Sequence, residues 1–205
     1  MAGFDENPRN AHQRMVRLVG NDKRVLEIGS GPGLVSERLA RNGCNVYAVE
    51  IDPEKAEQAK KFCKAVFVGN VEEMELALSR ESFDVILFGD VLEHLQHPEH
   101  TLERLKRFLR KDGIIVVSLP NVANWKVRAK LAAGKFEYED WGILDRTHLR
   151  FFTRKTARKL IEDAGFEIDR EEFVPSFPLP FLKAQLSRIN PNMFAFQFLF
   201  AAKKK

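Results

Sequence analysis

Residues 25–33 read Val-Leu-Glu-Ile-Gly-Ser-Gly-Pro-Gly, and this pattern indicates an apolar strand that runs into a glycine turn. Its first four residues are mainly apolar, as in a buried strand, and glycines then follow at alternate positions. Glycine permits the tight turn from a strand into a helix and lets a ligand approach the backbone closely. The amphipathic stretch Leu34–Arg41 predicts that helix, and its first amide groups would face the ligand.

Further along the chain, short apolar runs alternate with amphipathic stretches that have the pattern of helices. Helix starts are marked by Asp52-Pro53, by Pro98 and by Thr153, which are residue types favoured at the N-cap or at the first helical position. The alternation is typical of a parallel sheet with helices on both faces. The predicted parallel strands are residues 25–28, 46–51, 66–68, 85–88 and 114–119.

The pattern changes after Gly165, where two further strands are predicted over residues 166–174 and 194–202. No long crossover helix separates them, so we expect an antiparallel pair at the sheet edge. The sequence therefore predicts an α/β three-layer sandwich, mainly parallel, with an antiparallel C-terminal strand. We expect one domain over residues 1–205, with an insertion at about 121–145 that shapes a pocket above the strand ends.

The composition is that of an ordinary globular protein, with 44% hydrophobic and 30% charged residues among 205. Cys44 and Cys63 have no metal-binding spacing, which favours a reducing, cytoplasmic setting. Residues 1–14 have no apolar signal segment, and no run is long enough to span a membrane. The formal net charge of +4 is mild. Lys183 and Arg188 near the C-terminal prolines are too little charge for stable membrane attachment, which we therefore do not expect.

The glycine pattern distinguishes between two classes of cofactor. A dinucleotide fingerprint requires glycine at position 34, where this chain has Leu34. Glu27, just before the turn, would repel a pyrophosphate but suits a ligand with a free ammonium group. The predicted cofactor contacts around this turn are Glu27, Gly29, Ser30, Gly31 and Gly33.

The ends of the next strands supply further contacts for a nucleoside. Glu50 lies about twenty residues beyond the turn, where a carboxylate accepts hydrogen bonds from ribose hydroxyls. Ile51 can pack on a flat base, and Asn70 and Val71 follow the third strand, where Asn70 can bind the adenine edge. Gly89 ends the fourth strand and completes the predicted set.

These motifs, taken in order, resemble those of the class I S-adenosylmethionine (SAM)-dependent methyltransferases over roughly residues 24–165. VLEIGSGPG is similar to the family's first motif, YAVEID to its ribose-binding strand and FDVILFGDVLEHL to its fourth motif. The resemblance implies a Rossmann-like fold, SAM as cofactor and methyl transfer to a small-molecule acceptor. One departure is Asn70, where the family usually has Asp.

Three residues are candidates for catalysis. A sulfonium methyl group is already activated, so a base is needed only where the acceptor must lose a proton, as an alcohol does. His94 follows the fourth strand and His148 precedes the last helix, and either histidine can titrate near neutrality. The alternative for both is a loop histidine that bonds only to the backbone. Asp90 is the third candidate.

Asp90, Glu93 and His94 also offer the ligand types of a divalent-cation site, and their spacing resembles an acidic-histidine patch of ubiquinone-type O-methyltransferases. Acids that stabilise a helix N-terminus are the simpler interpretation, and we expect no metal there. The Asn-Pro-Pro-aromatic signature of amino methyltransferases is absent, and no Pro-Cys pair supports attack on cytosine. DNA is therefore not an expected acceptor, and an oxygen nucleophile is favoured.

The insertion mixes basic and aromatic side chains, a combination that suits an anionic, partly apolar acceptor or, alternatively, a solvated helix with a packed stripe. Its sequence, with DRTHLRFFT (residues 145–153), resembles small methyltransferases of sugar and cell-envelope biosynthesis. It also resembles a methyltransferase-like accessory protein that activates a partner biosynthetic enzyme, which is the alternative function. The basic residues in and beside the insertion are Lys126, Arg128, Lys130, Lys135, Arg146 and Arg150, and the aromatic ones are Trp125, Phe136, Tyr138 and Trp141.

The proline-rich stretch between the last two strands contains Phe177, Leu179, Phe181 and Leu182. These are many apolar side chains for a loop. We expect them to cover the acceptor pocket, with a surface patch for a partner or membrane as the alternative.

Overall fold

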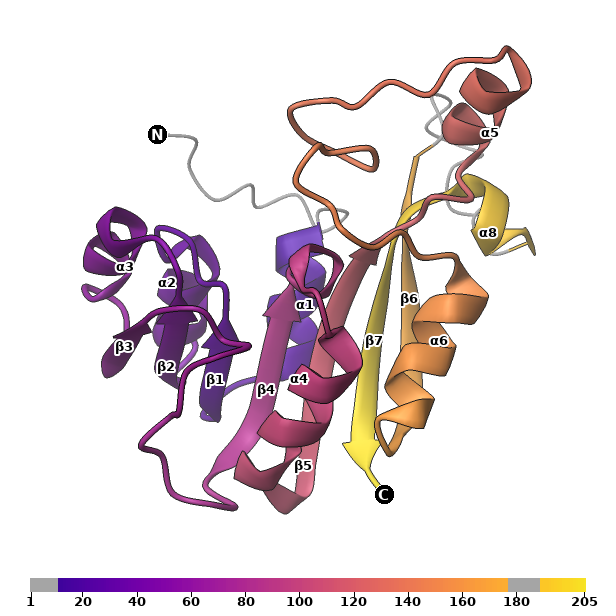
Figure 1. Cartoon of the computed structure of the whole chain (residues 1–205). Helices are drawn as coiled ribbons and strands as arrows, with labels where there is room; N and C mark the ends of the chain where they lie inside the picture. The colour runs from indigo at the N-terminus through magenta and orange to yellow at the C-terminus, as the bar shows by residue number, and fades with distance from the viewer. Residues whose placement is uncertain (1–10, 177–188) are drawn as a thin grey trace.

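The computed structural model describes residues 11–176 and 189–205, which together form a seven-stranded sheet with helices on both faces (Figure 1). The strand order is β3-β2-β1-β4-β5-β7-β6. Strands β1 to β5 pair in parallel, whereas β7 runs antiparallel to both β5 and β6. The predicted sandwich with an antiparallel C-terminal strand is thus confirmed. The strands are β1 (Arg24–Ile28), β2 (Asn45–Glu50), β3 (Ala65–Val68), β4 (Phe83–Gly89), β5 (Leu109–Pro120), β6 (Phe166–Pro175) and β7 (Ala195–Lys204).

The helices divide between the two faces of the sheet. Helices α1, α2 and α3 cover one face, and α4 and α6 cover the other, while α5 stands beyond the strand ends (Figure 1). The bounds are α1 (Ala11–Val19), α2 (Leu34–Arg41), α3 (Pro53–Ala59), α4 (Pro98–Leu105), α5 (Trp125–Ala132), α6 (Arg154–Asp163) and α8 (Pro191–Phe194), with short 3-10 helices η1 (Leu92–His94) and η2 (Lys106–Phe108). In the described parts of the chain no helix is long and apolar enough to cross a membrane.

The predicted helix starts at Pro53, Pro98 and Arg154 are confirmed, and the first and last of these helices have side-chain caps. The Asp52 carboxylate accepts the backbone N–H groups of Glu54 and Lys55 at the start of α3. At the start of α6, the Thr153 hydroxyl accepts the N–H of Thr156, and the Thr156 hydroxyl accepts the N–H of Thr153. These bonds satisfy amide groups that a helix leaves without partners.

The core lies on both sides of the sheet, as continuous apolar strands require. One cluster packs Phe88 and Phe198 against α4 and α6. The other packs Leu87 and Val116 against α1 and α2. Helix α1 contributes Met15, Val16, Leu18 and Val19 to this second cluster, and the sequence analysis did not predict that helix.

The strand order creates a crevice at one end of the sheet. The chain proceeds from β1 outward to β2 and β3, then returns to place β4 on the other side of β1. Ligands of open α/β sheets bind at the carboxyl ends of the strands at such a reversal. The glycine turn, Glu50 and Asp90 all lie at these strand ends.

The segment after β5 forms the predicted protrusion above the strand ends (Figure 1). An isolated bridge between Asn121 and Phe152 closes its base. Buried Asn121 donates hydrogen bonds to the carbonyl oxygens of Asn192 and Ala195, and Asn124 donates to Ala195 and to the Ser176 hydroxyl. The base of the insertion is therefore joined to the segments on either side of residues 177–188. The predicted pocket cover at Phe177–Leu182 lies outside the described residues.

Candidate active site

A cavity of about 580 Å³ lies at the carboxyl ends of β1 to β4. Its size is within the usual range for small-molecule sites. Many of the residues predicted from the sequence line it. These are Gly29, Gly31, Glu50, Ile51, Asn70, Val71, Asp90 and His94.

The glycine turn and Glu50 are joined by hydrogen bonds. The N–H of Gly31 donates to Oε2 of Glu50 at 2.6 Å, and the N–H of Asp52 donates to Oε1 at 3.0 Å. These two bonds fix the buried carboxylate at the cavity wall. A carboxylate has about four lone-pair sites, so acceptor capacity remains for two ligand hydroxyls.

The walls around Glu50 fit an adenosine group that has no phosphate. A Cβ added at Gly31 would meet no protein atom within 4 Å, so the turn leaves open space on its cavity side. Ile51 is 65% exposed beside Glu50, which places an apolar surface next to the carboxylate. The residues present therefore fit SAM, whose ribose hydroxyls and flat base need such partners.

Asn70 borders the cavity, but its carboxamide already has partners. Its Oδ1 accepts the N–H of Glu72 at 3.0 Å, and its Nδ2 donates to the Glu73 carboxylate at 2.8 Å. The residue thus shapes the turn after β3, and Val71 adds a buried side chain there. Contact between Asn70 and the adenine edge stays a prediction.

Glu27 is directed toward α2 rather than into the cavity lining. It is 4% exposed, and the Ser36 hydroxyl donates to its carboxylate at 2.5 Å. Burial raises the pKa of Glu27 to about 7, the Ser36 bond opposes the shift and the Glu50 carboxylate adds to it. The predicted role as partner of an ammonium group stays a prediction, since the carboxylate lies beneath the turn.

Ser30, Gly33 and Gly89 support the cavity from outside its lining. Gly33 has φ of 89° at the N-cap of α2, where a Cβ would approach the Ala59 Cα to 2.9 Å. A Cβ on Gly89 would approach Met15 of α1 to 3.3 Å. The buried Ser30 hydroxyl lies 3.4 Å from the Gly31 carbonyl oxygen. These residues allow close packing of the turn and of α1.

Asp90 follows β4 with a φ of 54°, an unusual value for a residue other than glycine. Its N–H donates to the Ser118 hydroxyl, and its Oδ1 accepts from that hydroxyl at 2.8 Å and from the Gln197 amide. Burial raises the pKa of the Asp90 carboxyl, while Ser118 and His12 of α1 oppose the shift. Strands β5 and β7 thus hold Asp90 at the cavity.

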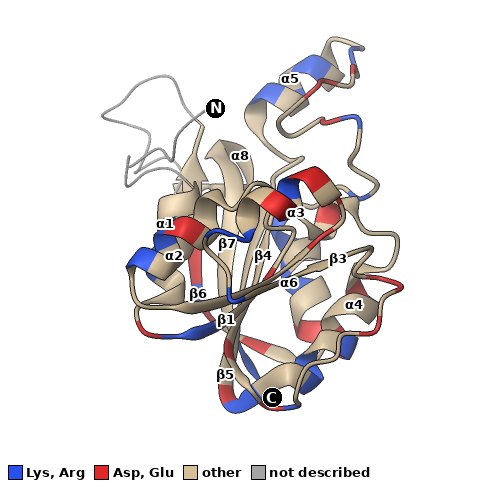
Figure 2. Ribbon diagram, turned by 90° about the vertical axis from the view of Figure 1, so that its left-hand side faces the viewer, with Lys and Arg blue, Asp and Glu red and all other residues tan. Residues whose placement is uncertain are grey.

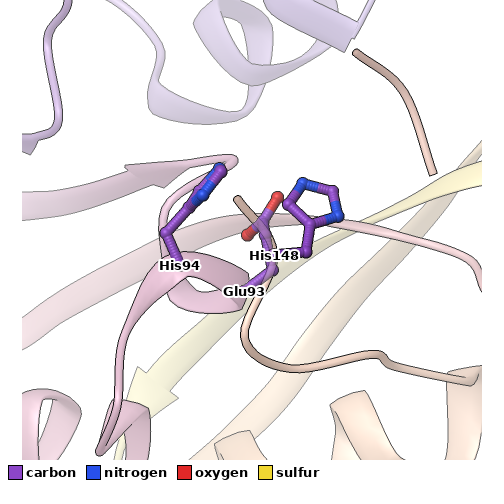
Figure 3. A group of neighbouring side chains, drawn as sticks. All are labelled: Glu93, His94 and His148. Atoms are coloured by element: carbon purple, nitrogen blue, oxygen red, sulfur yellow. The ribbon is translucent and has the colours of Figure 1, made fainter. Parts of the chain in front are cut away.

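The two candidate histidines come together from distant parts of the chain. The ring centroids of His94 and His148 are 4.8 Å apart, and the Glu93 side chain lies close to both rings (Figure 3). Nδ1 of His94 is 3.2 Å from both the carbonyl and the hydroxyl oxygens of Thr147. Nδ1 of His148 is 3.2 Å from the Ile143 carbonyl oxygen. A carbonyl oxygen can only accept, so each Nδ1 is the donor and each Nε2 keeps a lone pair.

The Glu93 carboxylate in this cluster is buried without the hydrogen bonds that such a group normally has. Glu93 is 1% exposed, and neither of its carboxylate oxygens has a hydrogen-bond partner. Burial raises the pKa of Glu93 well above its usual value, and the Asp90 carboxylate adds to the rise. Burial also lowers the pKa of His148, as does neighbouring His94, which favours the neutral imidazole.

The sequence analysis missed two contributors to the site. Thr147 lines the cavity, and its hydroxyl donates to Asp145 at 2.6 Å, which leaves the hydroxyl oxygen free to accept from His94. Its place between Asp145 and His148 in the sequence was the available signal. His12 of α1 is half-buried and acts electrostatically on Asp90, which no local pattern indicated.

Several basic residues of the insertion already have partners, although Lys and Arg are prominent on α5 (Figure 2). Lys130 pairs with Glu139, and Arg146 pairs with Asp140. Arg128 and Arg150 donate to the carbonyl oxygens of Ala123 and Gln96. Lys126 lies over the Trp125 ring, with its Nζ 6.0 Å from the ring centroid. An anionic acceptor stays a prediction.

Aromatic residues lead from the histidines into the insertion. Phe151 packs edge-on against His148 at 6.2 Å and against Phe136 at 6.3 Å, and Phe136 packs against Tyr138 at 5.5 Å. Trp141 is 77% exposed and Tyr138 is 54% exposed. The predicted packed stripe is therefore only partly buried.

Comparison with known proteins identifies one family. A family model described as a methyltransferase domain matches residues 5–171. The ubiquinone biosynthesis O-methyltransferase of Cereibacter sphaeroides is 32% identical over 158 residues, which cover 74% of this chain and 63% of that protein. The enzyme of the same name from Actinobacillus pleuropneumoniae is 30% identical over 108 residues, 48% of this chain and 46% of that one. The chain spans about half to two thirds of the length of these relatives.

Solved structures show the same fold at lower identity. A SAM-dependent methyltransferase from Archaeoglobus fulgidus has a TM-score of 0.70 at 19% identity, covering 96% of this chain and 92% of that chain. The 1,6-didemethyltoxoflavin-N1-methyltransferase of Burkholderia thailandensis, solved with S-adenosylhomocysteine, has a TM-score of 0.64 at 21% identity, covering 98% and 80%. At these identities the likeness concerns the fold alone.

Proposed function

We propose that this chain, which belongs to the class I SAM-dependent methyltransferase family, transfers a methyl group to an oxygen of a small-molecule acceptor. Its cofactor, as a member of that family, is SAM. The observation that carries the oxygen acceptor is the pair His94 and His148 beside the cofactor cavity. Relatives named O-methyltransferases point the same way.

SAM supplies a methyl group on a sulfonium, which is already activated for in-line displacement. The protein therefore has to hold the cofactor, orient the acceptor and receive its proton. Glu50 keeps acceptor capacity for the ribose hydroxyls, and the Gly31 turn leaves room for the ligand. In the proposed reaction, Glu50 and the Gly31 turn bind and position the cofactor.

We assign the removal of the proton from the acceptor hydroxyl to the two histidines. His94 lines the cavity, and its Nδ1–H is held by Thr147, so its Nε2 can accept a proton from a hydroxyl. Burial and His94 lower the pKa of His148, which favours the neutral imidazole that a base requires. Asp90 is fixed by Ser118 and Gln197, and this supports a role in orienting the acceptor or stabilising a protonated imidazole.

The first test concerns the cofactor. Glu50→Ala should weaken S-adenosylhomocysteine binding by about 1–3 kcal/mol, or roughly 5- to 150-fold, because charge-assisted hydrogen bonds to the ribose are lost. Isothermal titration calorimetry measures the change, with Glu57→Ala, an exposed acid of α3, as the control. NAD should show no comparable binding. Unchanged affinity in Glu50→Ala would contradict the assignment.

The second test concerns the reaction. Release of S-adenosylhomocysteine should be followed with phenols, carboxylic acids and sugar hydroxyls, and with amines as the contrasting class. With an accepted hydroxyl, His94→Ala or His148→Ala should lower turnover at least tenfold while cofactor affinity holds. Full turnover in both variants would rule out the base role. Cofactor binding without turnover on any acceptor would favour the accessory protein instead.

A further inference from the structure

We propose that Glu93, His94 and His148 form a binding site for one divalent cation of the zinc type. One ligand atom from each residue lies within 4.8 Å of the others (Figure 3). Binding of the ion requires no acceptor, whereas its use in catalysis rests on the proposed function. The site departs from the sequence-based expectation of no metal.

The Glu93 carboxyl is the first argument. Both of its oxygens are buried without a hydrogen-bond partner, although buried polar atoms are nearly always satisfied. The acids Asp90 and Asp145 act on it electrostatically, and both disfavour its negative charge. An unpaired buried carboxylate is costly, so this position calls for a cation or a bound proton.

The two histidines are already oriented as ligands. Nδ1 of His94 donates to Thr147, and Nδ1 of His148 donates to the Ile143 carbonyl oxygen. Metal-bound histidines typically donate their second ring N–H to a backbone carbonyl or a carboxylate in this way, which fixes the tautomer. The remaining Nε2 atoms carry the lone pairs that an ion needs.

The third residue differs from the one that sequence spacing indicates. Asp90 stands at a suitable spacing before Glu93, but its Oδ1 accepts bonds from Ser118 and Gln197. His148 takes the third place, although 54 positions separate it from His94 along the chain. Only the folded chain brings these ligands together.

The ligand types select the class of ion. Two imidazole nitrogens and one carboxylate oxygen suit Zn²⁺ and similar transition metals, whereas Mg²⁺ and Ca²⁺ prefer oxygen ligands alone. Ligand atoms around Zn²⁺ stand about 2.0–2.2 Å from the ion, so the side chains must close in by about 1 Å. Three protein ligands leave a position open, as in catalytic zinc sites.

The open position has a use within the proposed reaction. His94 lines the cofactor cavity, so an ion that it holds would lie beside the acceptor. A cation lowers the pKa of a bound hydroxyl and so favours its ionised form. The ion would then replace the imidazole base of the proposed function, because the Nε2 lone pairs of His94 and His148 would be bound to it.

The test is a Zn²⁺ titration of untagged protein stripped with a chelator, in competition with a chromophoric chelator. Wild type should bind one Zn²⁺ per chain, and His94→Gln and Glu93→Gln should bind it at least tenfold more weakly. His100→Gln is the matched control, because His100 is an exposed histidine of α4 outside the cluster. Binding that is absent in wild type, or equal in all four proteins, would overturn the proposal.

Co²⁺ gives a second measurement that reports the ligands directly. Bound by this cluster, it should show visible absorption distinct from the hexaaqua ion, and Glu93→Gln should alter or abolish that band. His94→Gln keeps the test valid if the buried Glu93 variant fails to fold, since His94 is partly exposed. A hexaaqua spectrum in wild type would overturn the proposal. Cofactor binding, measured without metal, would be unaffected by that outcome.

Discussion

At the scale of single residues, Glu27 couples the stability of the fold to pH. The folded chain raises the pKa of this carboxyl from 4.5 to about 7, chiefly by burial. Below pH 4.5 both folded and unfolded chains hold the proton, so the side chain is buried in its neutral form. As the pH rises toward 7, the unfolded chain releases the proton and the folded chain does not, which lowers the free energy of unfolding.

Glu27→Gln removes this titration while keeping a side chain of similar shape. The difference in unfolding free energy between wild type and variant should shift by about 3 kcal/mol in favour of the variant from pH 4.5 to above pH 7. Urea unfolding at pH 5 and pH 8 measures most of this change. Glu57→Gln, an exposed acid, serves as the control. Parallel pH profiles of wild type and Glu27→Gln would contradict the prediction.

Residue types and spacing predicted much of the cavity lining, but not the directions of side chains. Glu50 and Gly31 were identifiable because they end a strand and form a turn, and both line the cavity. Glu27 also belongs to a motif, yet its carboxylate turns to Ser36 beneath the turn. Packing against α2 decides that direction, and no local pattern records it.

At the level of the secondary-structure elements, the glycines of the turn between β1 and α2 have different roles. Gly29 is needed for packing within the protein, whereas Gly31 leaves space for the ligand. A Cβ on Gly29 would approach Val91 to 2.5 Å, so this position is required for packing. A Cβ on Gly31 meets no protein atom within 4 Å, although its φ is 54°. The cost of a side chain at Gly31 should therefore fall mainly on the ligand.

Gly31→Ala should weaken S-adenosylhomocysteine binding at least tenfold, because the methyl group enters space left for the cofactor. Gly20→Ala is a matched control, since Gly20 also has a positive φ, of 83°, and open surroundings. Both variants should lose about 1–2 kcal/mol of stability from the left-handed backbone. Calorimetry and urea unfolding measure the two effects. Equal cofactor affinity in the two variants would show that Gly31 does not border the ligand.

The elements of the sheet and most of their covering helices were predictable because their periodicity and caps are local signals. Helix α2 begins and ends at the predicted residues. Helix α1 was missed, although its apolar residues recur at helical spacing and Asn10 before it is a residue type favoured at the N-cap. Strand β5 starts at Leu109, five residues before the predicted start, since polar residues at its beginning hide it.

At the scale of the whole molecule, Asn121 joins the insertion to the C-terminal strand. It is fully buried, donates to the Asn192 and Ala195 carbonyl oxygens at 2.9 Å each, and accepts the N–H of Ala123. No local pattern indicated this connection, because its partners lie more than 70 positions away.

Asn121→Ala should lower the free energy of unfolding by about 2–4 kcal/mol, since each lost hydrogen bond costs about 1 kcal/mol and buried groups stay unsatisfied. Urea unfolding measures the loss, with Asn45→Ala as the control, because Asn45 is an exposed asparagine of β2. A loss no greater than that of Asn45→Ala would show that the insertion is held by other contacts.

The placement of β7 between β5 and β6 has a consequence for the order in which the chain is made. Strand β6 emerges from the ribosome first, yet within the described sheet it pairs with β7 alone. Until β7 has been synthesised, β6 has no neighbour and the outer edge of β5 is open, so both are exposed to wrong pairing. Gln197 of β7 also donates to Asp90, so the cavity formed by the earlier strands is complete only after β7 has been synthesised and has paired. Chaperones that bind nascent strands would be needed most during this interval.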